Sequence, residues 1–338
     1  MIDTVEFLYH GVIIDQSSLT NWAYSKRPIR KGKYWLHTYE YTAHVNGAPI
    51  VFMYFPVAKQ GTSYLKIRFS LPHLLFGNNY TPLYDLDWGI RHANLLLPIL
   101  PGIPKLDLRK GILSRLDICY DFQVGQRISD YIWTLHYLEY PRRKTKPYSS
   151  EGVMYVNGEA TLKFYNKPRQ LLEVLKDRVG AEKAMGKLRM ELMCGPRYIK
   201  RILKEMKPTF NHITLDLLLD ALENSLSELG LLGTVICTEQ TAYEQLIQEH
   251  GKQKGLQLHQ TLCLKMRERS IKIIAITLER HPRTIARRYD DIKEAAVALT
   301  LTPTEVDLPQ FVFDRKLIYS SQEELKKGLR SNGGLYAS

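Results

Sequence analysis

The stretch ATLKFYNKPRQL, residues 160–171, reads as the end of a strand followed by the start of a helix. Leu162 and Phe164 alternate with polar residues, and such alternation places side chains on opposite faces of a β-strand. Pro168 cannot donate a hydrogen bond within a sheet, but it suits the first turn of a helix. We therefore expect Tyr165 to lie near the end of a strand, on its polar face.

Three further segments alternate in the same way, and each has one apolar face and one charged face: SYLKIRF (63–69), LSRLDICYDF (113–122) and KLRMELMC (187–194). On the four strands the charged residues are Lys66, Arg68, Arg115, Asp117, Asp121, Lys163, Lys167, Arg189 and Glu191. A solvated outer face of an antiparallel sheet is the plain explanation. Such a face would also carry Ser, Thr and Gln, which are almost missing here, so we favour a surface that binds a polyanion.

The predicted secondary structure changes near residue 196 from mostly strands to mostly helices. Before it, strand signals dominate, with additional strands expected at 34–45, 49–55 and 153–156 and hairpin turns at Asn46-Gly47 and Asn157-Gly158. Helices are expected at 85–99, 129–140 and 168–179, and PRRKTKPYSS (141–150) is expected to be a basic loop. After it, helices are expected at 196–206, 213–229, 239–250, 256–268, 270–280 and 283–297. The pattern predicts an α+β fold with a mostly antiparallel central sheet and helices on one face, followed by a helical C-terminal domain.

We place the domain boundary near Lys207-Pro208, which separates a catalytic domain (1–207) from a helical DNA-binding or accessory domain (208–338). The net charge of +12, from 47 Lys and Arg against 35 Asp and Glu, favours nucleic acid as a partner. A merely basic soluble protein is the rival explanation. No apolar run reaches the ~18 residues of a membrane span, and MIDTVEFLYH lacks the features of a secretory signal, so we expect a cytoplasmic protein.

Several classes of site are disfavoured by motif. The four cysteines, at 119, 194, 237 and 263, are far apart and form no C-x-x-C pair, so we expect reduced thiols and no structural zinc site. Paired histidines, H-E-x-x-H, a Walker loop and a dinucleotide fingerprint are all missing from the sequence.

The charged strands suit transfer of a phosphodiester. Tyrosine can act as a covalent nucleophile, but its ordinary pKa of ~10 requires neighbouring cations or a metal to favour the phenolate. Lys163 and Lys167 flank Tyr165 for this purpose. Carboxylates beside a polyanion repel it unless a divalent cation lies between them, so we assign Asp117 and Glu191 as ligands of Mg²⁺ or Mn²⁺. Asp121 lies too far along its strand to bind the same ion.

Three motifs in order, LSRLDICYDF, ATLKFYNKPRQL and KLRMELMCGPRYIKR, resemble the replication initiators of filamentous phages (gene II/X type). The Y-N-K run is also similar to the Y-[DEN]-K motif of plasmid rolling-circle initiators and some relaxases. The resemblance covers about residues 1–206 and implies a nicking-endonuclease-like fold and a site-specific, metal-dependent DNA nickase. In that family pattern Tyr165 is the nucleophile, Asp117 and Glu191 surround the metal, and the partners are origin DNA and host helicase and polymerase in a bacterial cytoplasm.

The segment SIKIIAITLERHPRTIARRYDDIKEAAVAL (270–299) predicts two helices separated at His281-Pro282. This is consistent with a helix-turn-helix whose second helix, carrying Arg283, Arg287 and Arg288, reads the origin. An ordinary helical bundle would give the same pattern.

The residues of the predicted site also have plain structural explanations. Tyr165 could pack its ring within the sheet, Asp117 could pair with Arg115 or Arg189, and Glu191 could pair with Arg189. Lys66 and Arg68 would then be edge-strand charges, not phosphate contacts. For the whole chain, the rivals of a replication initiator are a non-enzymatic DNA-binding regulator and a mobilisation relaxase or transposase with the same chemistry.

Overall fold

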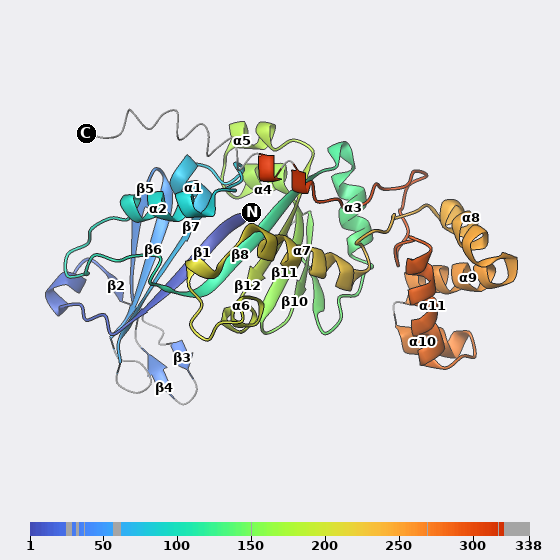
Figure 1. Cartoon of the computed structure of the whole chain (residues 1–338), viewed down its shortest axis with the longest axis horizontal. Helices are drawn as coiled ribbons and strands as arrows, with labels where there is room; N and C mark the ends of the chain where they lie inside the picture. The colour runs from blue at the N-terminus through green and yellow to red at the C-terminus, as the bar shows by residue number, and fades with distance from the viewer. Residues whose placement is uncertain are drawn as a thin grey trace. The chain divides into compact units, whose positions relative to one another are not determined.

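A computed structural model of the chain describes residues 1–24, 29–31, 34–36, 38–56, 62–149, 151–268, 270–316 and 318–320 (Figure 1). Its main feature is a ten-stranded sheet with the order β2-β5-β6-β7-β1-β8-β12-β11-β10-β9. The bounds are β1 (Ile2–His10), β2 (Ala23–Tyr24), β5 (Tyr39–Val45), β6 (Ala48–Phe55), β7 (Tyr64–Ser70), β8 (Ile112–Gln123), β9 (Lys144–Pro147), β10 (Gly152–Val156), β11 (Ala160–Asn166) and β12 (Lys187–Cys194). The predicted α+β class with an antiparallel sheet is confirmed.

Contacts between residues group the chain into two compact units. The first contains residues 1–119, 192–219 and the described residues from 314 onward, and the second contains residues 120–191 and 220–313. These units are defined by packing alone, and the limits between them fall within β8 and β12. The predicted boundary at 207/208 separates two functions, so it stays a prediction.

In the first unit β1 pairs antiparallel with both β7 and β8. Val5 and Phe7 on β1 are fully buried, so this strand supplies the centre of the apolar core. The helices α1 (Leu71–Phe76), α2 (Leu86–Leu96) and α6 (Pro196–Leu203) belong to this unit, and α7 (Leu215–Leu229) continues into the second. Ser70 and Asp85 cap α1 and α2 with their side chains, as expected for residues that accept the unpaired amides of a first turn.

Several predicted elements are corrected by the structure. The predicted helix 168–179 is two helices, α4 (Lys167–Glu173) and α5 (Arg178–Lys183), because Lys176 adopts a positive φ of 57° and Asp177 caps a new helix. The predicted helix 129–140 is α3 (Ile128–Leu135). The predicted loop 141–150 contains strand β9, which pairs with β10.

The predicted strand 34–45 is also divided. Its first part is β4 (Tyr34–Leu36), which pairs with β3 (Ile29–Lys31) in a separate two-stranded sheet, and its second part is β5. His37, between them, lies outside the described residues.

The helical part of the second unit consists of α8 (Glu239–His250), α9 (Lys252–Glu268), α10 (Ile271–Thr277) and α11 (Pro282–Glu294) (Figure 1). Its core contains the fully buried side chains of Leu246, Leu262, Ile274, Ile285 and Ile292. The apolar periodicity in the sequence therefore marks real buried faces. Every helix among the described residues is too short or too polar to cross a lipid bilayer.

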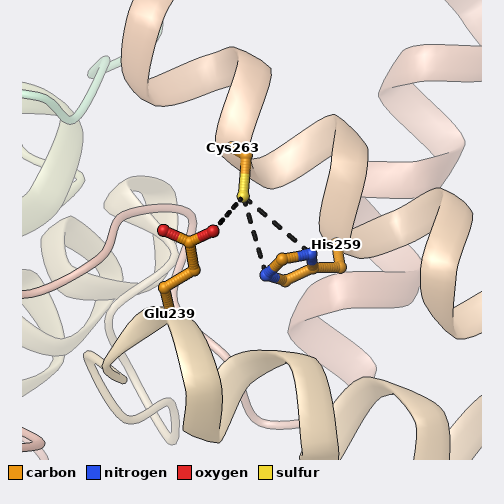
Figure 2. A group of neighbouring side chains, drawn as sticks. All are labelled: Glu239, His259 and Cys263. Atoms are coloured by element: carbon orange, nitrogen blue, oxygen red, sulfur yellow. Dashed lines mark hydrogen bonds between the residues drawn. The ribbon is translucent and has the colours of Figure 1, made fainter.

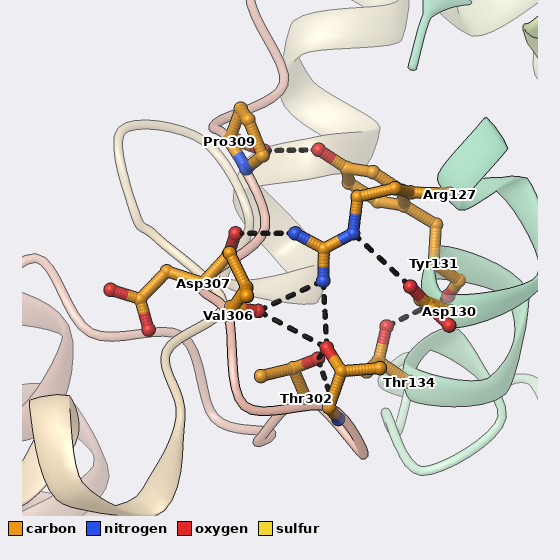
Figure 3. A network of polar contacts seen from close by, with 9 residues as sticks. Arg127, Asp130, Tyr131, Thr134, Thr302, Val306, Asp307 and Pro309 are labelled. Carbon is orange, nitrogen blue, oxygen red and sulfur yellow. Dashed lines mark hydrogen bonds and ion pairs between the residues drawn. The ribbon is translucent and has the colours of Figure 1, made fainter. Parts of the chain in front are cut away.

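The segment after α11 is tied to α3 by polar contacts (Figure 3). The guanidinium of Arg127 donates to the carbonyls of Val306 and Asp307, each at 2.9 Å, and to Thr304 Oγ1 at 2.7 Å. The hydroxyl of Tyr131 donates to the carbonyl of Pro309 at 2.7 Å. These contacts direct the next residues of the chain, Phe311 and Phe313, into the apolar core of the second unit.

Candidate active site around Tyr165

Tyr165 lies on β11, between strands β10 and β12 of the sheet. In the β10–β11 pair it faces Gly152, which has no side chain. A Cβ atom at residue 152 would lie 3.0 Å from the Cβ of Tyr165 and 2.5 Å from the carbonyl oxygen of Tyr148. The glycine therefore allows the chain around Tyr148 to approach the tyrosine closely.

The hydroxyl of Tyr165 donates a hydrogen bond of 2.8 Å to Glu191 Oε2. The other oxygen of the same carboxylate, Oε1, accepts from Lys163 Nζ, also at 2.8 Å. Tyr165 is only 3% exposed and the side chain of Glu191 only 7%. A tyrosine hydroxyl, a carboxylate and an ammonium thus form one buried chain of contacts within the second unit.

Burial raises the pKa of the Glu191 carboxyl, because a charge is costly away from water. The charge of Lys163, the hydrogen bonds from Lys163 and Tyr165, and the charge of Arg189 together outweigh burial, so the pKa is lowered overall. Glu191 is therefore ionised at neutral pH and acts as a hydrogen-bond acceptor. A nucleophile beside a base that is held by a third group is the arrangement that covalent catalysis uses.

The ring of Tyr148 covers this group of side chains. Its centroid is 5.3 Å from that of Tyr165, and the ammonium of Lys163 lies 4.9 Å from the centre of the Tyr148 ring. Tyr148 itself is half-buried and follows the edge strand β9. This residue was not identified from the sequence. The available signal was an aromatic residue at the end of a basic segment, but its position beside Gly152 depends on the pairing of β9 with β10.

A second ion pair neighbours the first on β12. Arg189 binds Asp121 through two bonds, from Nε to Oδ1 at 2.5 Å and from Nη2 to Oδ2 at 2.7 Å. Burial raises the pKa of Asp121, but Arg189 and, more weakly, Lys167 and Lys187 lower it below its ordinary value. Arg189, for which the sequence offered Asp117 or Glu191 as partners, thus forms a bidentate pair with Asp121.

Lys167 and Asn166 end β11 and start α4. Lys167 is fully buried, and its Nζ donates to Gln170 Oε1 at 2.9 Å. Asn166 caps the helix by accepting from the amide of Arg169 at 3.1 Å, and its side-chain amide donates to Glu151. The predicted strand-to-helix change at Pro168 is confirmed. The side chains of all three residues of the Y-N-K run form hydrogen bonds.

Three predicted site residues of the first unit, Arg115, Asp117 and Lys66, form ion pairs. Asp117 is 1% exposed and accepts from Arg115 Nε at 2.9 Å and from Arg115 Nη2 at 2.6 Å, which is the salt bridge that the sequence allowed as a plain explanation. Lys66 binds the buried Glu6 at 2.6 Å. Burial raises the pKa of Glu6, but Lys66, Ser114 and Arg68 together lower it overall.

The predicted metal ligands differ in their surroundings. Asp117 and Glu191 belong to different compact units, so their convergence on one Mg²⁺ or Mn²⁺ ion stays a prediction. A basic side chain forms an ion pair with each carboxylate: Arg115 with Asp117 and Lys163 with Glu191. The metal stays a prediction, and the step proposed below is derived from the protein side chains.

The predicted DNA-reading residues lie on α11, where Arg283 and Arg287 are exposed. Arg288 is half-buried and donates to Thr261 Oγ1 at 2.9 Å and to Gln257 Oε1 at 3.1 Å. Two of the three arginines therefore point to solvent, while Arg288 holds α11 to α9.

Comparison of the chain with protein-family models, curated proteins and solved structures gives no match.

Proposed function

We propose that this protein is a tyrosine DNA nickase and strand transferase that initiates rolling-circle replication at an origin. The observation that carries the proposal is the contact of 2.8 Å between Tyr165 Oη and Glu191 Oε2, with Lys163 on the other carboxylate oxygen. The resemblance of the Y-N-K run to the initiator motif supports the same role for this tyrosine.

The step is a transesterification. Tyr165 Oη attacks the phosphorus of a DNA phosphodiester, a bond forms between Oη and phosphorus, and the bond from phosphorus to the 3′-oxygen breaks. The hydroxyl proton passes to Glu191 as the new bond forms, and the departing 3′-oxygen takes a proton from water. The products are a 5′-phosphotyrosine and a free 3′-hydroxyl, and the reverse reaction rejoins the strand without an added energy source.

The basic side chains have separate parts in this proposal. Lys163 orients Glu191 and, with Lys167, offsets the negative charge of the attacked phosphate. Arg189 keeps Asp121 neutralised so that it does not repel DNA. Lys66, Arg68 and Arg115, in the first unit, and Arg283, Arg287 and Arg288, on α11, stay assigned to DNA binding, with Arg283 and Arg287 the best exposed of this last group.

Because Tyr165 is 3% exposed, a strand of DNA reaches its hydroxyl only when Tyr148 moves aside. We assign this opening to the segment that carries β9, an edge strand whose four residues are all exposed. An edge strand has neighbours on one side only and opens more easily than a central one.

The test uses supercoiled DNA that carries the chain's own replication origin, incubated with the full-length protein and Mg²⁺ or Mn²⁺. Denaturing electrophoresis then detects protein that is covalently attached to DNA. Wild type is expected to form the adduct and to relax the DNA, and Tyr165→Phe is expected to form none. Tyr148→Phe, which keeps the covering ring, is the matched control and is expected to keep the adduct.

Adduct formation by a folded Tyr165→Phe protein would sink the assignment of the nucleophile. A second candidate function is a non-enzymatic DNA-binding regulator. The observation that favours it is the exposure of Arg283 and Arg287 on α11. Wild type that binds origin DNA specifically, but never nicks it with either metal, would support that regulator. A relaxase or transposase would give the same adduct on a transfer-origin or transposon-end sequence.

A further inference from the structure

The helical part of the second unit holds a group of metal-ligating side chains that the proposed nickase chemistry does not use. Glu239 is the first residue of α8, and His259 and Cys263 lie four residues apart on α9. Residues four apart share one face of a helix. Figure 2 shows the Cys263 sulfur between the carboxylate of Glu239 and the imidazole of His259.

The packing of α8 on α9 brings these residues together. Gly251 ends α8 with a φ of 78°, and α9 starts immediately after it. A Cβ atom at Gly255 would lie 2.7 Å from the Cα of Ile247, so this glycine permits the backbones of the two helices to approach closely. Two residues distant from each other in sequence, 239 and 263, thereby become neighbours.

Two of the spacings are those of a tetrahedral metal site. The sulfur of Cys263 is 3.6 Å from Glu239 Oε1 and 3.6 Å from His259 Nε2. It is also 3.9 Å from His259 Nδ1, so the imidazole has to turn to aim one nitrogen at the ion. In tetrahedral zinc sites, with Zn–S of about 2.3 Å and Zn–N or Zn–O of about 2.1 Å, sulfur lies about 3.6 Å from each of the other ligand atoms. All three ligand atoms lie within 4.8 Å of one another.

The group also has the right ligands and access. Thiolate and imidazole ligands favour Zn²⁺, whereas Mg²⁺ and Ca²⁺ favour oxygen ligands. Glu239 is exposed, while His259 and Cys263 are half-buried, so a metal ion can enter from solvent and the carboxylate can adjust. Within the part of the chain that the structure describes, this is the one group of three or more such side chains that lie this close together.

We propose that Glu239, His259 and Cys263 bind one Zn²⁺ ion, which clamps the start of α8 to α9 and leaves a fourth position open to solvent. The site is independent of the proposed nickase function. Binding releases the thiol proton to solvent, because the thiolate is the form that ligates.

The test uses the full-length, reduced protein after removal of metals with a chelator. Titration with Co²⁺ is expected to give the near-ultraviolet charge-transfer band of a cobalt–thiolate bond and the strong visible bands of tetrahedral cobalt, and one equivalent of Zn²⁺ should abolish them. Cys263→Ser is expected to lose the charge-transfer band, and His259→Gln is expected to weaken binding by more than the roughly 10–100-fold seen for outer-shell changes.

Cys237→Ser is the matched control. Cys237 is buried in the same helical part and donates to the carbonyl of Val235 at 3.7 Å, so a serine hydroxyl can replace it and the cobalt spectrum should stay as in wild type. Wild type without a cobalt–thiolate band, or Cys263→Ser with the wild-type spectrum, would overturn the proposal. Thermal melts of the metal-free variants check folding, and zinc should raise the melting temperature of wild type but not of Cys263→Ser.

Discussion

Phe164 and Tyr165 are neighbours on β11 and are almost equally buried, yet they lie on faces of opposite character. Phe164 is fully buried, and its ring packs against Phe311 at 5.9 Å and Tyr155 at 6.5 Å. Tyr165 is buried on the other face, where its hydroxyl binds Glu191 and its ring lies under Tyr148.

The difference shows two ways of burying a strand. The apolar face gains free energy in proportion to the area removed from water. The polar face gains little net energy, because each charge there must be matched by a partner to offset its lost hydration. The apolar face therefore supplies stability, whereas the polar face positions groups for chemistry.

The largest stability effect is expected on the apolar face. Phe311 packs on the rings of Phe122 at 4.8 Å and Tyr131 at 5.3 Å, so Phe311→Ala should lower the free energy of unfolding by about 3–5 kcal/mol. Val312, the next residue, is 64% exposed, and Val312→Ala should change it by less than about 0.5 kcal/mol. Denaturant unfolding measures both free energies. If Phe311→Ala cost as little as Val312→Ala, the segment after α11 would not be part of the core.

A smaller effect is expected on the polar face. Tyr165→Phe keeps the ring but removes the donor to a buried carboxylate, so the free energy of unfolding should fall by about 1–3 kcal/mol. Tyr41→Phe, in the first unit, where the ring packs on Trp22, is the control and should cost less than about 0.5 kcal/mol. An unchanged stability in Tyr165→Phe would show that the hydroxyl is not held by Glu191 in solution.

The smallest effect is a change in how stability depends on pH. The pKa of Glu191 is lowered in the folded protein, so its stabilising contribution is present above the unfolded pKa of about 4.3 and is lost as pH falls through the lower, folded pKa. Glu191→Gln should therefore lose stability less steeply in acid than wild type. Thermal melts between neutral and acidic pH measure this, and parallel curves would contradict an ionised, paired Glu191. Glu249→Gln, at an exposed residue of α8, retains Glu191 and should follow wild type.

Local sequence patterns predicted much of the secondary structure. The strands at 160–166 and 187–194 and the helix at 239–250 have the predicted bounds, because alternation and helical periodicity are properties of short segments. The same patterns failed where a single backbone angle decided the outcome, as at Lys176 between α4 and α5.

The candidate site was predictable in part. Alternation placed Tyr165, Lys163 and Glu191 on charged faces, and the structure brings these three together. Alternation could not predict that the ring of Tyr148 covers them or that Arg189 pairs with Asp121. Periodicity gives the face of a strand on which a residue lies, but not the register of the neighbouring strand.

The sequence by itself determined which residues alternate, which segments form helices, and the surplus of positive charge. The tertiary structure alone decided which charges neutralise one another, how Phe311 enters a core far from it in sequence, and how Glu239 meets His259 and Cys263. The physical reason is that these contacts join segments separated by many residues, so they depend on the packing of whole strands and helices, which no local pattern encodes.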